Sequence, residues 1–448
     1  MKIRKMLALV LALMLAVSLF AGCGSSRTTT TNTGSDTTAT SDAATTGDEA
    51  EAPADTDAGE TEEVTVKGTV KIGHLLDLTG NEAATGNQAQ TAFNFAAECI
   101  GLCGGYEIEV VEQDCQSNSG MAAQAAATLV ENEGVVAIFG PTQIGHKSAV
   151  ASYLQDSGVP LILYNGTPTG MLASSDWVVG EGGSTNGFPT SVAYYAYYEL
   201  GWRNVYTVRQ QTTGGDNYVL PFEEIFTALG GNIIDSVELP VSGSDYSSLL
   251  ATFTNPDADG IAGWTSSTDA INFWSSWYEL GLAERLPVIG TMHGGFTDFY
   301  IMNQLNNSNP EIVNAIVNNN DTYSVINYCY SIDSPENEAL VAAWQEEFGT
   351  VPGGNNLAGA CWQALQVFQA AMDATDGDTD PETLLNAILD VDLTGPEGHV
   401  FFAEGTRAAT KDVNIVKVVQ LEDGTYNYQV VKTYYDVGAD GYDGSDYT

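Results

Sequence analysis

The stretch VKIGHLLDLTGNEAATGNQAQTAFNFAAE, residues 70–98, begins a pattern that the rest of the chain repeats. It contains a short apolar run and then spacing compatible with a helix over 89–100. Similar helical spacing returns at 121–131 and 147–156. The strands predicted between these helices are 69–76, 108–112, 135–139 and 160–164. Such alternation predicts βαβ units, and therefore a parallel sheet with helices on both faces.

The same alternation resumes after residue 187, which predicts a second lobe. Helices are expected at 188–200, 219–229, 246–253 and 268–280, and strands at 204–208, 232–239, 259–263 and 286–290. Helices at 335–348, 357–374 and 381–389 follow, and then a hairpin of 412–420 and 426–434 around Glu422-Asp423-Gly424. The predicted fold class is therefore α/β with two lobes.

The first 23 residues predict export and lipidation. A positive segment with Lys2 and Lys5 precedes a largely apolar run, 6–19, and Ala21-Gly22 places small residues before Cys23. The run is shorter than the roughly 20 residues of a membrane-spanning helix. It resembles a bacterial lipoprotein signal more than an anchor helix or an ordinary signal peptide. A diacylated Cys23 would hold the protein stably on the extracytoplasmic face of the cell membrane.

Residues 24–65 are expected to be a disordered linker, because 24–63 contain no Val, Leu, Ile, Met or aromatic residue. The body that follows is acidic, with 48 of the 58 Asp and Glu against 10 Lys and Arg. This charge repels phosphate backbones, so nucleic acid is not an expected partner. The end, 437–448, is expected to be an acidic, glycine-rich, solvated tail, since its aspartates lack the spacing of a calcium loop.

The sequence contains no motif of a common enzyme or metal site. It has no HExxH, GxSxG, GxxxxGK[ST] or CxxC, and no GxGxxG followed by a suitable acid. We therefore expect no catalysis, cofactor or metal. Cys329 and Cys361 have the apolar contexts of buried thiols, whereas two of Cys99, Cys103 and Cys115 are close enough in sequence to pair.

Several segments together resemble one known family. Residues 70–98, 105–141 (GYEIEVVEQDCQSNSGMAAQAAATLVENEGVVAIFGP) and 157–167 (SGVPLILYNGT) are similar to the first lobe of type I solute-binding proteins of ABC importers, the leucine/isoleucine/valine-binding family. The similarity continues through ELGWRNVYTV (199–208), DGIAGW (259–264), GLAERLPVIGT (281–291) and FGTVPGGNNLAGACWQALQVFQAAMDA (348–374).

The resemblance implies two Rossmann-like lobes with parallel-rich sheets, joined by three crossovers near Gly183, Asn327 and Pro396. Lobe 1 would contain 66–183 and 331–396, and lobe 2 would contain 184–327 and 397–436. It also implies a protein that captures a small ligand by hinge closure and delivers it to an ABC permease.

Ligands of open α/β sheets bind at the carboxyl ends of strands, so candidate residues lie in the loops that follow them. Thr85 opens the first helix, where N–H groups suit an anion unless this is an ordinary turn. Thr142 and Gln143 follow the third strand, where the family has serines at Gln143 and the next position. After the fourth strand, the resemblance places the Gly166 carbonyl at a ligand amine. It places the Thr167 hydroxyl and N–H at the ligand carboxylate, with loop capping as the alternative role.

In the second lobe, Tyr218 is the nearest replacement for a family tyrosine, unless it begins a helix and faces solvent. Trp264 ends a strand, where its indole either stacks on a planar ligand or belongs to the core. Met292 and His293 stand where the family keeps an acid for the ligand ammonium. Because a buried ammonium needs a counter-ion, either Glu181 or Asp269 supplies it, or the ligand is not a zwitterion.

We therefore predict an extracytoplasmic solute-binding lipoprotein for a small polar ligand that is amino acid-like, an amide or related. A ligand-sensing receptor with the same fold and a degenerate surface hydrolase are the alternatives.

Overall fold

The computed structural model describes residues 66–80, 82–265, 267–293, 299–319, 322–353 and 357–447. The predicted signal, Cys23 and the linker lie outside these ranges. Within them, every helix is too short or too polar to cross a membrane.

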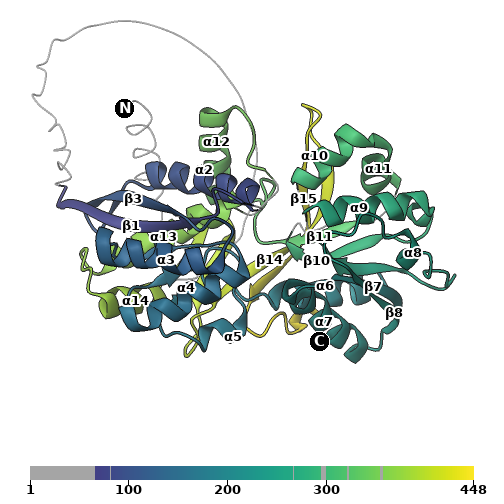
Figure 1. Ribbon diagram of the computed structural model, residues 1–448, viewed down its shortest axis with the longest axis horizontal. Helices are drawn as coiled ribbons and strands as arrows, with labels where there is room; N and C mark the ends of the chain where they lie inside the picture. The colour runs from purple at the N-terminus through teal and green to yellow at the C-terminus, as the bar shows by residue number, and fades with distance from the viewer. Residues whose placement is uncertain are drawn as a thin grey trace, which may run out of the picture. The chain divides into compact units, whose positions relative to one another are not determined.

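Six strands form the first sheet, in the order β2-β3-β1-β4-β5-β6. The parallel strands are β1 (Gly68–Leu76), β3 (Tyr106–Asp114), β4 (Ile138–Phe139), β5 (Leu161–Ile162) and β6 (Val178–Val179), and β2 (Leu102–Cys103) is an antiparallel edge. The helices of this lobe are α2 (Ala83–Ile100), α3 (Ser119–Thr128), α4 (Ile144–Ser157), α5 (Thr169–Leu172), α12 (Pro335–Phe348), α13 (Leu357–Ala374) and α14 (Pro381–Leu389) (Figure 1).

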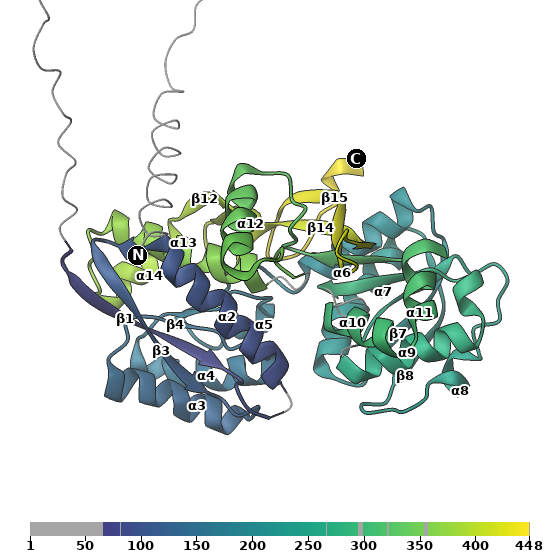
Figure 2. The ribbon, with the colours of Figure 1, turned by 90° about the horizontal axis from the view of Figure 1, so that it is seen from above.

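Nine strands form the second sheet, in the order β12-β13-β14-β11-β10-β9-β7-β8, with β15 paired to β14. Its parallel part comprises β7 (Asn204–Gln210), β8 (Asn232–Leu239), β9 (Gly260–Trp264), β10 (Val288–His293) and β11 (Tyr323–Ile326). The antiparallel part comprises β12 (Asp392–Gly395), β13 (Gly398–Phe402), β14 (Ala409–Gln420) and β15 (Tyr426–Val437). Its helices are α6 (Gly187–Tyr194), α7 (Thr213–Ala228), α8 (Ser247–Leu250), α9 (Ser267–Glu279), α10 (Phe299–Ser308) and α11 (Pro310–Asn314) (Figure 2).

The chain passes between the two sheets three times: after β6, after β11 and after α14. This confirms the predicted class, two α/β lobes with parallel-rich sheets joined by three crossovers. One strand departs from the expected division of the chain. β12 precedes the crossover expected at Pro396, yet it pairs with β13 in the second sheet.

The cores contain several fully buried aromatic side chains. Trp274 and Trp277 are fully buried in the second lobe. His74 is fully buried and stacks on Phe93 with ring centroids 4.0 Å apart, and burial lowers its pKa to about 3, so the ring is neutral. The five cysteines after the linker are free thiols, and those of Cys103 and Cys115 are buried without forming the disulfide that their spacing allows.

The C-terminal segment differs from the solvated tail expected from its composition. Tyr442 is 6% exposed, and its N–H donates to the Thr190 hydroxyl at 2.8 Å. The Tyr447 ring stacks on Tyr198 with centroids 4.4 Å apart, and its hydroxyl donates to Glu199 at 2.8 Å. Two aromatic rings therefore supply enough apolar surface to dock a segment in which charge and glycine dominate the sequence pattern.

A buried group of three charges connects the crossovers. Nζ of Lys411, in β14, lies 2.9 Å from Oε1 of Glu181, which follows β6, and it also bonds Glu397, which precedes β13. Burial raises the pKa of both carboxyl groups, that of Glu181 to about 7. Burial alone would lower the pKa of Lys411, but the two carboxylates raise it above its usual value.

We expect Lys411→Met to destabilise the fold by on the order of 3 to 5 kcal/mol near pH 7, because two buried carboxylates lose the ammonium group that pairs with both of them. Both carboxyl groups have raised pKa values in the folded state, so they bind protons more readily there than in the unfolded chain. The loss should therefore shrink as the pH falls from 8 to 5. Urea unfolding across this pH range measures it, with Lys71→Met, which breaks a partly exposed pair with Glu133, as the control. An equal loss of stability at every pH would contradict the role proposed for the buried group of Lys411, Glu181 and Glu397.

Candidate ligand-binding site

The loop after β5 brings several predicted residues to the carboxyl end of the first sheet. The Nδ2 of Asn165 donates to the carbonyl of Thr142, which follows β4, at 3.4 Å. The N–H of Thr167 donates to the Gly183 carbonyl at 2.8 Å, so it is not available to a ligand carboxylate. The Thr167 hydroxyl, in contrast, is buried and has no partner among the described residues. Of the two Thr167 groups that were expected to face a ligand, the hydroxyl is therefore the one that could still bond it.

Three further predicted residues lie together. A Cβ built on Gly166 would lie 3.4 Å from the hydroxyl oxygen of Tyr218, which belongs to α7 in the second lobe. Tyr218 is 3% exposed, so it does not face solvent, and burial raises its pKa. Its ring centroid lies 5.9 Å from that of Trp264, at the end of β9. The indole Nε1 of Trp264 is buried and makes no hydrogen bond to the described part of the chain.

Lys147 joins this group, although its place in the sequence predicted only the start of a helix. It lies in α4 and is 1% exposed. Its Nζ donates to the carbonyl oxygens of Asn165, at 2.6 Å, and Gly166, at 2.8 Å. Burial lowers the pKa of its ammonium group to about 7. The signal in the sequence was weak: Lys147 is the first residue of the predicted helix 147–156, in a body that has few basic residues.

The start of α2 does not have the character of an anion site. Thr85 is half-buried in the first turn of α2, beside Glu82, and Gln143 donates from Nε2 to Oε2 of Glu82 at 2.8 Å. Packing explains why position 86 is a glycine, since a Cβ there would lie 2.0 Å from the Asp77 carbonyl oxygen. With Glu82 and the buried Asp77 close to this turn, the geometry favours an ordinary strand-to-helix connection.

The two acids considered for a ligand ammonium already have partners. Glu181 pairs with Lys411. One carboxylate oxygen of Asp269 accepts from Gln210 and from the Ser242 N–H, and the other accepts from the Tyr246 hydroxyl at 2.8 Å. Asp269 therefore fixes a loop and a tyrosine within the second lobe. Met292 and His293 lie in β10, and the description of the structure does not extend to their side chains.

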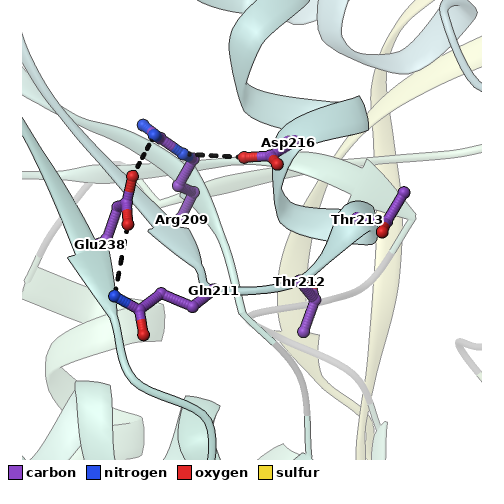
Figure 3. Close-up of a pocket in the computed structure, with 6 residues that line it drawn as sticks. All are labelled: Arg209, Gln211, Thr212, Thr213, Asp216 and Glu238. Carbon is purple, nitrogen blue, oxygen red and sulfur yellow. Dashed lines mark hydrogen bonds and ion pairs between the residues drawn. The ribbon is translucent and has the colours of Figure 1, made fainter.

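A hollow of about 410 Å³ lies beside the start of α7 (Figure 3). The Arg209 guanidinium lies between two carboxylates in it, with Nε 3.0 Å from Asp216 and a further bond to Glu238. Glu238 also accepts from Gln211 at 3.3 Å, and Thr212 and Thr213 complete the lining. Because Arg209, the cation among the described lining residues, is already paired, this hollow offers less to a ligand than the group around Gly166. The described residues contain no cluster of three His, Cys, Asp or Glu that suits a metal ion.

Comparison with known proteins identifies the family of the chain. The profile of the periplasmic binding protein family matches residues 69–425, so the chain belongs to that family. The chain is 23% identical over 376 residues to the Leu/Ile/Val-binding protein homolog 6 of Brucella suis, covering 83% of this chain and 93% of the relative. The fold is that of solute-binding proteins of ABC transporters.

Two solved structures illustrate the similarity. An ABC transporter substrate-binding protein from Sphaerobacter thermophilus superposes with a TM-score of 0.74 and 26% identity, covering 83% of this chain and 99% of that one. A solute-binding protein from Rhodopseudomonas palustris, solved in complex with 3,4-dihydroxybenzoic acid, superposes with a TM-score of 0.72 and 22% identity, covering 83% and 98%.

We expect Thr167→Val to weaken ligand binding by roughly 1 to 3 kcal/mol. The change removes the side-chain hydroxyl that would bond a desolvated polar atom of the ligand, while it conserves the shape of the side chain. Without ligand, the same change should leave stability equal or higher, since the hydroxyl has no partner in the described structure. Calorimetry and thermal unfolding test the two halves. Thr190→Val is the matched control: its buried hydroxyl donates to the Asn186 carbonyl at 2.7 Å, so its loss should destabilise the fold and spare binding. Unchanged affinity in Thr167→Val would leave this threonine a structural role.

Proposed function

We propose that the protein is a lipid-anchored, extracytoplasmic solute-binding protein whose ligand is a small planar, aromatic molecule and not a branched-chain amino acid. The observation that carries this proposal is Trp264, a nearly buried indole with an unpartnered Nε1 beside Tyr218 and Gly166. An indole and a phenol ring at one place provide stacking surface and a hydrogen-bond donor for a planar ligand. The protein would capture this ligand and deliver it to an ABC permease, and the proposed cycle includes no catalytic step.

The relatives support the proposal in two ways. The Rhodopseudomonas protein binds a dihydroxybenzoic acid in the same fold, so the fold accommodates an aromatic ligand. The Brucella relatives are named as homologues of branched-chain amino-acid binders, which need a partner for the ligand ammonium. Here Glu181 and Asp269 are engaged elsewhere. An unpaired ammonium in a closed site would cost more than the roughly 1.5 to 3 kcal/mol that burial of a leucine side chain contributes.

We expect the purified protein to bind a benzoate-type ligand measurably and leucine, isoleucine and valine poorly or not at all. A thermal-shift panel of amino acids, amides, purines and aromatic acids provides the first screen, since a ligand at 100 times its Kd adds about 2.7 kcal/mol of stability. Calorimetry then ranks the hits. Trp264→Ala should weaken every aromatic hit. Submicromolar binding of leucine would contradict the proposal.

The membrane anchor is proposed from the sequence, in which the apolar run ends at Cys23. We expect Cys23→Ala to leave the body folded and either release it to the medium or leave it uncleaved, because lipid and not the fold holds it. Fractionation of cells that express the wild type and the variant, followed by a salt wash, measures this. A processed Cys23→Ala protein that stays on washed membranes would show a different mode of attachment.

A further inference from the structure

Lys147 has a buried ammonium group that no carboxylate balances in the described structure. Its two hydrogen-bond partners are the backbone carbonyls of Asn165 and Gly166. Other lysines of the body behave differently: Lys71 and Lys432 pair with carboxylates near the surface, and the buried Lys411 has two. Neutral carbonyls compensate a buried charge only in part, and its full stabilisation requires an anion.

We propose that Lys147 is the counter-ion of the ligand, and that the site takes a small organic carboxylate that has no ammonium group. An ammonium group has three donors, and the two carbonyls use two of them. The third has no partner among the described residues, which leaves it for a ligand oxygen. This inference rests on the proposed function and deepens it, because it names the charged group of the ligand and the residue that binds it.

The polar atoms around Lys147 suit such a ligand. Thr167 follows Gly166 in the chain, and Thr142 is hydrogen-bonded to Asn165. The hydroxyls of both threonines are buried and unpartnered within the described ranges, and both can donate to carboxylate oxygens. Trp264 adds an indole N–H, which only donates. The unpartnered Oδ1 of Asn165 is an acceptor, which suits a hydroxyl group on the ligand.

The same contacts exclude an amino acid. The resemblance to leucine binders implies that the Gly166 carbonyl accepts from the ligand amine. In this protein the carbonyl accepts from Lys147 at 2.8 Å. A ligand ammonium placed there would share this acceptor with Lys147 and lie beside a like charge in a desolvated site. Lys147 therefore occupies the position of the ligand amine and converts a zwitterion site into an anion site.

The test compares an acid with its uncharged amide. Calorimetry at pH 7 on the purified full chain measures 4-hydroxybenzoate and 4-hydroxybenzamide, which differ in charge but hardly in shape. We expect the wild type to prefer the acid by roughly 10-fold or more, as charge-assisted hydrogen bonds are stronger than neutral ones. Lys147→Met should weaken binding of the acid by roughly 10- to 100-fold and change the affinity for the amide little. Lys71→Met removes a surface charge from the same lobe and should preserve the preference.

A second measurement does not depend on the folding of a variant. At pH 8 a lysine with a pKa of about 7 is mostly neutral, and a bound carboxylate favours its charged form. Binding of the acid should therefore take up protons, which calorimetry in buffers of different ionisation enthalpy detects. The other titratable groups on the adjoining elements are His146 and Asp77, which lie 3.1 Å apart, with Glu82, Tyr164 and Tyr218. Lys147→Met should abolish the uptake if Lys147 is its source.

The outcomes separate this inference from the proposed function. The role of Lys147 is overturned if the wild type binds acid and amide equally, or if Lys147→Met binds the acid as tightly as the wild type does. Either result is still compatible with an aromatic ligand that stacks on Trp264. Tight binding of an uncharged member of the panel, with no binding of the acid, overturns it as well. Tight binding of leucine overturns the proposed function itself.

Discussion

The two lobes depend on the first residues of β14, because all three crossovers are bonded there. The first crossover pairs with it through Gly180, whose carbonyl accepts from the Ala409 N–H at 2.9 Å, and through Glu181, which pairs with Lys411. The second is held by Asn327, whose Nδ2 donates to the Asp412 carbonyl at 2.9 Å. The third is held by Glu397 on the same lysine. One short stretch thus fixes how the chain leaves and re-enters each sheet, and it can act as a hinge because few residues carry the connection.

Two buried lysines have opposite consequences in this fold. Lys411 is surrounded by two carboxylates, so its charge is satisfied within the protein and its role is structural. Lys147 has two carbonyls and a lowered pKa, and several of the buried polar atoms near it lack partners in the described ranges. Orphaned polar groups cost free energy when desolvated, and a ligand that satisfies them restores it. The difference between these two environments distinguishes the crossover region from the proposed binding site.

The sequence predicted the helices and the fold class better than it predicted the short strands. α12, α13 and α14 have the predicted bounds, because Ser334 and Asp380 cap two of them and proline begins both of these. β4 and β5 are much shorter than the apolar runs that contain them, since burial and not strand pairing produces those runs. α7 begins six residues earlier than predicted. Thr212 caps it through the Gly215 N–H, which allows helix over a glycine pair that normally opposes it.

The candidate site shows the same limit more sharply. Strand-end position, together with the family resemblance, selected Gly166, Thr167, Tyr218 and Trp264, because strand order fixes which loops converge. It could not select Lys147, whose partners are backbone carbonyls 18 and 19 positions away in sequence. Every residue has a backbone carbonyl, so the residue type does not indicate which carbonyl accepts a hydrogen bond from a distant lysine. In the proposed site this occupied carbonyl decides the charge of the ligand, because Lys147, a single side chain from α4, bonds the acceptor that the family resemblance assigns to a ligand amine.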